Sequence, residues 1–456
     1  MGRKKEIDMT TGPIMKKVFL FAIPIIIGNV LQQLYTTVDT LVIGRFCGDE
    51  ALAGVGTSAQ PVEVLLCIFL GIGTGTSILV SQYKGAKDDE GIKKLCDSAV
   101  TFVYACAIPV SILGIILAPY MLRVMKVPAD AYESALYYTR LVFVGTLGNI
   151  GYNMNAGILR GLGDSLASLR FLLISCISNI VLDVLFVAGF GMDVSGAALS
   201  TSLSMYLSWI MSIVYIRRRF AYIGFSFIPR GFYGKQLKEI VGLGLPIGLN
   251  NSLYSFGHVA IQVMVNSQGT DFVSGITIAG RITGLSNIAI TALSSATTTY
   301  AGQNYGAGNY KRLKDGHLRI PLYSGFITLA FGLFFISIRN PILAFFSSNP
   351  VVLGYASRYV FVLLLSQWIY AIFNGIMCIL NGIGKVRYTT IVNLLMLWMV
   401  RIPSGFIITR FFDGTYVMLC FPISFTFAAI CLLSYYIFSK QWKDMMKLAT
   451  DDKASY

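Results

Sequence analysis

A few ionisable side chains interrupt the long apolar stretches of this 456-residue sequence, and they are the residues best placed to do chemistry. They are Asp39, Glu63, Asp183, His258, Arg281 and Arg401. A charged group in hydrocarbon is unfavourable by several kcal/mol unless it is paired or hydrated, so such residues commonly mark ion or substrate pathways. All the carboxylates of this set lie in the N-terminal half, where we therefore expect ion chemistry.

Asp183 follows Asn179 by one helical turn, so the two side chains are expected on one face of a helix. A carboxylate and an amide oxygen on one face can form a Na⁺ or proton site. If Asp39 approaches this face, two carboxylates share a poorly solvated space and titrate as one coupled unit, able to take up a proton outside and release it inside. The alternative is that both carboxylates only pair with buried donors such as Asn29, Gln32 or Tyr35 and hold helices together.

Pro24 lies about four helical turns before Asp39. A proline inside a helix removes one backbone hydrogen bond and favours a kink. Bending at Pro24 could couple protonation of Asp39 to the side of the membrane from which the site is accessible. A static kink is the alternative.

The other ionisable residues have less definite roles. Arg401 stands two residues before Pro403, and we expect it to satisfy carbonyls freed by the proline or to neutralise a partner. His258 and Arg281 have no identifiable partner and are interpreted as structural. Glu63 fits a structural or a substrate-binding role equally well.

Motifs for soluble-enzyme chemistry are missing from the sequence. The two histidines, His258 and His317, lie far apart, and the eight cysteines show no CxxC spacing, so neither a metal site nor a hydrolytic triad is indicated. The glycine-rich run Gly71–Thr76 lacks the GK[ST] of a phosphate loop and lies in an apolar stretch, which favours close helix packing instead. We therefore expect no enzyme activity and no cofactor, and any transport should use an ion gradient.

The elements that position these residues are transmembrane helices. Hydrophobic residues make up 55% of the chain and charged residues only 13%, and most apolar runs exceed the 18 or so residues that cross a bilayer. The predicted spans are 16–43, 51–80, 98–118, 133–159, 166–189, 194–216, 238–266, 273–302, 318–338, 351–381, 388–411 and 416–438. The first is interpreted as a retained helix, because no small-residue cleavage site follows it. The fold class is all-α integral membrane.

Basic residues cluster between alternate spans and at both ends of the chain. Most of the 36 Lys and Arg then fall on one side, which assigns that side and both termini to the cytoplasm. The net charge of +14 is thus explained by membrane topology, and no nucleic-acid partner is expected.

Two halves of the sequence resemble each other. SQYKGA and GQNYGA begin at Ser81 and Gly302, and ILRGLG and ILNGIG at Ile158 and Ile379, each pair 221 residues apart. Pro24 and Pro246 match with one residue of slippage. A polar linker, 217–238, separates the halves, so we predict lobes at 1–225 and 226–456 with six spans each. Parallel repeats of this kind are typical of secondary transporters that work by alternating access.

The sequence resembles the multidrug and toxic compound extrusion (MATE) family, and most closely its DinF-like branch. The likeness rests on Pro24, Gln32, Tyr35 and Asp39 in the first span, on the GLG turn before the fifth, and on SNIVLDVLF followed by GAALST. It implies two pseudo-symmetric six-helix lobes around a V-shaped cavity. It also implies export of cationic and amphipathic compounds in exchange for Na⁺ or H⁺ across a plasma membrane, with a bacterial host and a monomeric state.

The resemblance also implies site residues. The cation site maps to Asp39, Asn179, Asp183, Thr201 and the backbone of Ala197, and Na⁺ is possible there. Substrate contacts map to Gln32, Tyr35, Asn153 and Asn155, with Glu63 added, and the hinge to Pro24. The NorM-like branch carries acidic residues in its seventh and tenth spans, where this chain offers His258, Gln367, Trp368 and Asn374, so coupling should rest on the N-terminal lobe.

Three other functions remain as alternatives. A flippase of lipid-linked saccharide, from the same superfamily, would commonly show extra spans or several cationic cavity residues. A membrane acyltransferase would need clustered His, Asp or Ser at a membrane edge. A channel would need a ring of equivalent pore residues, which twelve different spans do not supply. The choice between H⁺ and Na⁺, the physiological substrate and the oligomeric state stay open.

Overall fold

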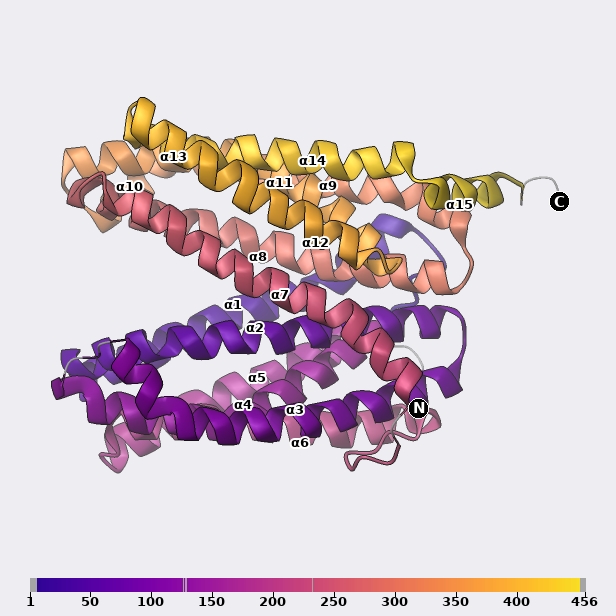
Figure 1. The fold of residues 1–456 in the computed structure, drawn as a ribbon, viewed down its shortest axis with the longest axis horizontal. Helices are drawn as coiled ribbons and strands as arrows, with labels where there is room; N and C mark the ends of the chain where they lie inside the picture. The colour runs from indigo at the N-terminus through magenta and orange to yellow at the C-terminus, as the bar shows by residue number, and fades with distance from the viewer. Residues whose placement is uncertain (1–5, 126, 128, 232, 452–456) are drawn as a thin grey trace. The chain divides into compact units, whose positions relative to one another are not determined.

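The computed structural model describes residues 6–125, 127, 129–231 and 233–451, and this part of the chain forms helices and connecting turns without a strand. The all-α prediction is therefore correct. Figure 1 shows the helices as long rods.

Each predicted span coincides with a long helical segment of the described chain. In the N-terminal half these are α1 (Ile14–Phe46), α2 (Asp49–Gly85), α3 (Asp89–Val124), α4 (Ala129–Gly161), α5 (Ser165–Asp183) with a π-helical turn (Val184–Gly189), and α6 (Asp193–Arg219). In the C-terminal half they are α7 (Gly234–Asn266), α8 (Thr270–Gly306), α9 (Tyr310–Ser337), α11 (Pro350–Gly382), then α12 (Val386–Leu395), a second π-helical turn (Met396–Arg401) and α13 (Ile402–Phe411) as one span, and α14 (Cys420–Phe438). Short 3₁₀ turns (Ala221–Ile223 and Gly414–Leu419) and two more helices, α10 (Arg339–Phe346) and α15 (Lys440–Asp451), complete the described chain.

Ten of these segments contain a stretch long and apolar enough to cross a membrane. The other two, α4 and α7, have 33 residues each, which is also long enough, and each carries several asparagines. The twelve segments together form the predicted multi-span membrane protein.

The two sequence repeats have the same backbone geometry. After α2 and after α8 the chain turns through Lys87 (φ 56°) and Gly308 (φ 67°), and the next side chain, Asp88 or Asn309, caps the following helix. After α4 and α11 it turns through Gly163 (φ 95°) and Gly384 (φ 84°). Positive φ favours glycine, which explains why the ILRGLG and ILNGIG copies both keep a glycine at this point.

The described chain divides into two compact units by its internal packing. The first comprises residues 6–8 and 23–251, and the second residues 9–22 and 252–451. Two helices, α1 and α7, contribute to both units, and Pro24 follows the point at which α1 passes from one to the other. The predicted lobe boundary at 225 falls in the connection between α6 and α7.

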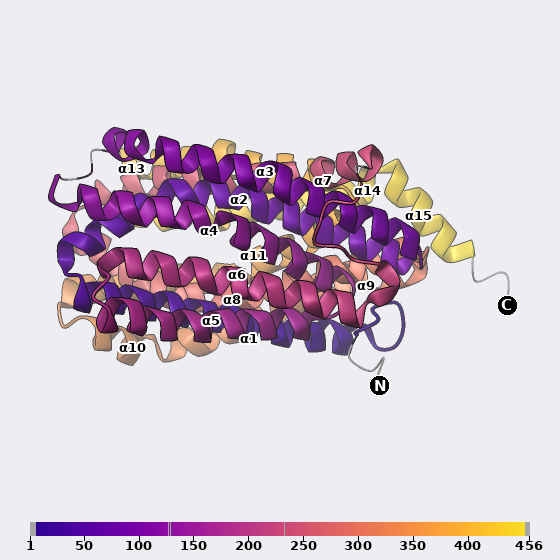
Figure 2. The same cartoon turned by 90° about the horizontal axis from the view of Figure 1, so that it is seen from below.

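Each unit has its own core. In the first unit α4 packs against α2, α3 and α6, and α5 packs against α6; Figure 2 shows α3 beside α4 and α5 beside α6. In the second unit α11 is central and packs against α8, α9 and α14. The cores are built from buried aliphatic and aromatic side chains of these helices.

The glycine-rich run of α2 packs directly against backbone. A Cβ atom on Gly71 would lie 2.1 Å from the backbone nitrogen of Gly248 in α7, and one on Gly75 would lie 2.6 Å from that of Gly244. On another face, a Cβ on Gly157 of α4 would lie 2.4 Å from the Gly73 carbonyl oxygen. The prediction that this run packs helices rather than binding phosphate is therefore confirmed.

We predict that Gly71→Ala lowers the thermal stability of the purified protein, because the added methyl group overpacks the α2–α7 contact by about 1–3 kcal/mol. The matched control is Gly242→Ala in α7, where a Cβ meets nothing within 4 Å. That control should be neutral or slightly stabilising, since alanine favours helix over glycine by up to about 1 kcal/mol. Equal melting temperatures for the two variants would contradict the packing argument.

Candidate functional site

Asp183 and Asn179 occupy one buried face of α5. Asp183 is 0% exposed and Asn179 is 2% exposed, as expected for residues one turn apart. Asp183 is the last residue before the π-helical turn Val184–Gly189. Such turns insert one residue into a helix and occur frequently at functional sites.

Polar side chains of α6 contact both of these residues. Asn179 Nδ2 donates a hydrogen bond to Thr201 Oγ1 at 3.2 Å. The Ser200 hydroxyl contacts Asp183 Oδ1 as a donor and also lies 2.8 Å from the Ala197 carbonyl oxygen. The structure thus brings Asn179, Asp183, Ala197 and Thr201 together, as the resemblance implied, and adds Ser200.

Asp39 reaches the same site from α1. Its carboxyl group lies within hydrogen-bonding reach of the Asp183 carboxyl group. The phenol groups of Tyr35 and of Tyr138, from α4, lie within electrostatic range of both carboxyls. Apolar residues around Val42 and Val187 flank the site, and Tyr138 packs against them. Four helices, α1, α4, α5 and α6, therefore supply the polar groups of one site.

Three oxygen atoms of this site are buried without a hydrogen-bond donor among the described residues. They are Asp39 Oδ1, Asn179 Oδ1 and Asp183 Oδ2. A buried polar atom left without a partner costs about 1–3 kcal/mol. Ionised carboxylates and an amide oxygen are acceptors only, so a proton or a small hard cation is the group that would satisfy them.

The alternative role for the two carboxylates was pairing with neighbouring donors. Gln32 is exposed, and the structure contains no hydrogen bond from Gln32 or Tyr35 to either carboxylate. Among the described residues no cluster of three or more His, Cys, Asp or Glu side chains could hold a metal ion, so a transition-metal site is not indicated. The donor set fits H⁺ or Na⁺.

The remaining predicted substrate residues lie in other surroundings. Asn153 donates to the backbone and side-chain oxygens of Asn149, both at 2.9 Å. Asn155 is 2% exposed and donates to Ser212 Oγ at 2.8 Å. The structure does not join these two asparagines to the carboxylate pair. The Glu63 side chain lies outside the described residues.

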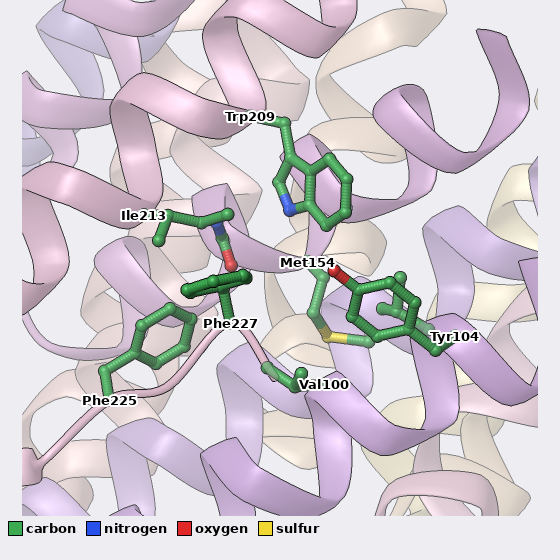
Figure 3. Close-up of a pocket in the computed structure, with 10 residues that line it drawn as sticks. Val100, Tyr104, Met154, Trp209, Ile213, Phe225 and Phe227 are labelled. Atoms are coloured by element: carbon green, nitrogen blue, oxygen red, sulfur yellow. The ribbon is translucent and has the colours of Figure 1, made fainter. Parts of the chain in front are cut away.

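A small cavity in the first unit lies beside Asn155 (Figure 3). Tyr104, Met154, Trp209 and Phe227 point into it, and its volume is about 10 Å³. That is room for about one water molecule, so this space is a packing defect and not a site for an organic compound.

The second unit contains a larger cavity of about 270 Å³. His258 and Gln367 line it, as do several tyrosines and phenylalanines, and no carboxylate does. Trp368 is partly exposed, and the Asn374 amide contacts the Ser294 hydroxyl.

The expectation for Arg401 is wrong. Its guanidinium group satisfies no backbone carbonyl and meets no carboxylate among the described residues, but donates to the Tyr254 and Ser424 hydroxyl groups. Neighbouring side chains from α7 and α14, which the local sequence around Pro403 does not reveal, supply these partners. Arg281 is exposed.

Comparison with known proteins gives a consistent result over the whole chain. A family model described as MatE matches residues 24–185 and again residues 246–407, one match in each repeat. Two Bacillus subtilis (strain 168) proteins are similar: the probable multidrug resistance protein YpnP, 30% identical over 98% of this chain and 100% of its own length, and the probable multidrug resistance protein YoeA, 26% identical over 95% and 96%. A solved structure described as the outward-facing conformation of a multidrug resistance MATE family transporter of the MOP superfamily shares the fold, with a TM-score of 0.90 and 24% identity over 98% of this chain and 100% of that one.

We predict that Asp39→Asn raises the melting temperature in Na⁺-free buffer at pH 9 and leaves it nearly unchanged at pH 5. At pH 9 the wild type holds two like charges in one space, a repulsion on the order of 1–4 kcal/mol, whereas at pH 5 a proton is available to the pair. Thermal unfolding of the purified protein in detergent measures this.

The control for this prediction is Asp97→Asn in α3. Asp97 is 4% exposed, like a site residue, but its charged neighbours are Lys93 and Arg230. Its replacement should not stabilise the protein at pH 9. A lower melting temperature for Asp39→Asn at pH 9 would show that the carboxylate pair does not repel.

Proposed function

The chain belongs to the MatE family of multidrug efflux transporters, and from this premise we propose that it is an antiporter that exports cationic or amphipathic organic compounds in exchange for H⁺ or Na⁺. Its relatives are named as multidrug resistance proteins, and we expect neither enzyme activity nor a cofactor. The chain is a multi-span membrane protein with bacterial relatives.

The observation that carries the proposal is the set of unpartnered oxygens on Asp39, Asn179 and Asp183. When a cation is bound, the buried oxygens of the site have a partner, and this loaded state is favoured. When the site is empty, it holds two adjacent carboxylates. Such a pair responds to the cation concentration on the side to which it is open. This difference between loaded and empty states is what coupling requires, because a ligand shifts a conformational equilibrium only by its differential affinity for the two states.

We assign the cycle as follows. Facing outside, the pair takes up H⁺ or Na⁺, and the loaded N-terminal lobe favours release of the exported compound. Facing inside, it gives up the cation, regains its negative charge and favours binding of the next cationic compound. The lobes 1–225 and 226–456 alternate between the two orientations, with Gln32, Tyr35 and Glu63 as proposed substrate contacts.

Position in α1 supports a hinge role for Pro24. It lies on the same helix as Asp39, close to the point at which α1 passes from the second unit to the first. A proline inside a helix lowers the energy needed to bend it, since one backbone hydrogen bond is already missing. We propose that bending at Pro24 carries the change at Asp39 along the helix.

We propose that both termini face the cytoplasm and that the protein is a monomer in the plasma membrane. The basic residues between alternate spans support this orientation. A flippase of lipid-linked saccharide would commonly show several cationic cavity residues. Of the two arginines considered, Arg401 is buried and Arg281 is exposed, so we favour export over flipping.

We predict that Asp39→Asn and Asp183→Asn each abolish gradient-driven export of ethidium from proteoliposomes while leaving folded protein. Neither variant can alternate between an ionised pair and a loaded site. Wild type is measured with an imposed pH or Na⁺ gradient, and the gradient that supports export identifies the coupling ion. The control Asp97→Asn should transport like wild type. Export that persists in both variants would exclude coupling through this pair, and no gradient-dependent movement of several such cations by wild type would favour the flippase.

We predict that Pro24→Ala slows export at least tenfold without changing the cation dependence of thermal stability. The substitution restores a backbone hydrogen bond, so it stiffens α1 but leaves the carboxylate pair in place. Proteoliposome export and melting temperature at several Na⁺ concentrations and pH values measure the two effects. Pro109→Ala in α3, another proline inside a helix, is the control. Wild-type export by Pro24→Ala would rule out the hinge.

A further inference from the structure

Arg401 is a fully buried cation in the second unit. Its side chain is 1% exposed and lies at the end of the π-helical turn Met396–Arg401. Its Nε donates to Ser424 Oγ at 3.0 Å, and its Nη1 donates to the Tyr254 hydroxyl at 2.7 Å. Its Nη2 contacts the Met396 sulfur at 3.7 Å, so all three partners are neutral, and no carboxylate among the described residues pairs with this guanidinium. A buried charge without a counter-charge is strongly unfavourable, so its retention calls for an explanation.

Aromatic rings compensate part of this charge. The guanidinium carbon lies 4.8 Å from the ring centre of Phe421, 5.1 Å from that of Phe425 and 5.4 Å from that of Tyr254. The negative faces of these rings attract a cation and shield it from hydrocarbon. They contribute no net charge, however, so the region stays positive.

The same three rings line the 270 Å³ cavity. Arg401 therefore lies directly behind the cavity wall formed by Tyr254, Phe421 and Phe425. The volume is near the lower limit for small-molecule sites, which begin at about 300 Å³. Since none of the lining residues is acidic, the positive charge behind the wall meets no opposing charge in the cavity.

Two hydrogen-bond donors on the cavity wall can contact an anionic ligand that this charge attracts. The Tyr254 hydroxyl oxygen accepts from Arg401, so its own proton is free for another acceptor, and hydrogen bonds in such a chain strengthen one another. His258 is exposed, lines the cavity and packs edge-on against Tyr254 with ring centres 4.9 Å apart. The neutral imidazole also offers one N–H donor.

The rest of the wall is aromatic and carries one unpartnered acceptor. Tyr359 and Tyr370 add ring faces to those of Phe421 and Phe425. Gln367 is 5% exposed, and its Oε1 has no donor among the described residues. A ligand with a flat ring and a hydroxyl or amino group would satisfy both features.

We propose that this cavity binds the carboxylate of an aromatic organic acid, with the Tyr254 hydroxyl and the His258 ring as donors and Arg401 as the charge behind them. Every residue of the site belongs to the second unit. The site is thus separate from the carboxylate pair of the first unit and opposite to it in charge preference. A compound that carries both a cationic and an anionic group would find a complementary charge in each half of the chain.

The test is equilibrium binding of 6-hydroxy-2-naphthoate to the full-length purified protein in detergent, measured by isothermal titration calorimetry. The matched neutral ligand is 6-hydroxy-2-naphthamide, which keeps the ring, the size and the hydroxyl group. Wild type should bind the acid at least tenfold more tightly than the amide. Equal affinity for the two, or no binding of the acid, would overturn the proposal.

Variants locate the binding within the protein. Tyr254→Phe keeps the ring that shields Arg401 but removes the donor, and should weaken binding of the acid about tenfold and of the amide much less. His258→Gln should have the same sign of effect. Tyr359→Phe, which removes a hydroxyl group from the same cavity without a bond to Arg401, should stay within twofold of wild type. If Tyr254→Phe and His258→Gln both bind the acid like wild type, the acid binds elsewhere and the proposal fails.

The proposal is independent of cation coupling, and one further variant shows this. Asp183→Asn should bind the naphthoate like wild type even though it is expected to lose coupled export. A loss of acid binding in Asp183→Asn together with retention in Tyr254→Phe would place the anion site in the first unit and refute the assignment.

Discussion

Two carboxyl groups that share one enclosed space are the interaction on which the rest of the proposed mechanism depends. Asp39 from α1 and Asp183 from α5 lie within hydrogen-bonding reach of each other, and each leaves one buried oxygen unpartnered among the described residues. In water such a pair would be hydrated and of little consequence. In a membrane the pair is favoured when a positive group joins it. The proposed mechanism therefore requires two helices that hold the carboxyl groups together and a path by which a cation enters and leaves.

Close packing of α2 can hold helices rigidly, and irregular segments in α1 and α5 can allow local conformational change. Glycines of α2 contact the backbones of α4 and α7, which fixes those helices at a separation that larger side chains would not permit. By contrast, α1 contains Pro24, and α5 passes into a π-helical turn directly after Asp183. Asp183 thus lies directly beside a departure from regular helix, and Asp39 lies on the same helix as Pro24, about four turns away.

The halves repeat one framework and fill it with opposite charges. Their turns agree in backbone conformation down to the positive φ values of Gly163 and Gly384. The first unit nevertheless holds a carboxylate pair, while the second buries Arg401 beside an aromatic cavity. A duplicated scaffold therefore constrains helix length and turn geometry, and leaves the side chains at the centre of each half free to diverge.

The sequence by itself determined the membrane class, the helical spans, the repeat and the face shared by Asn179 and Asp183, because apolar length, turn glycines and helical spacing are local properties of a chain. It also indicated Asp39, as an ionisable residue within an apolar stretch, and Thr201, although the latter only through resemblance to a family. Only the tertiary structure showed that Ser200 and Tyr138 lie beside the Asp39 and Asp183 carboxyl groups, that Asn155 bonds to Ser212 instead, and that Arg401 contacts hydroxyl groups and rings rather than carbonyls. These are contacts between helices far apart in the chain, and their partners depend on how each helix is rotated and packed, which no local pattern of residues specifies.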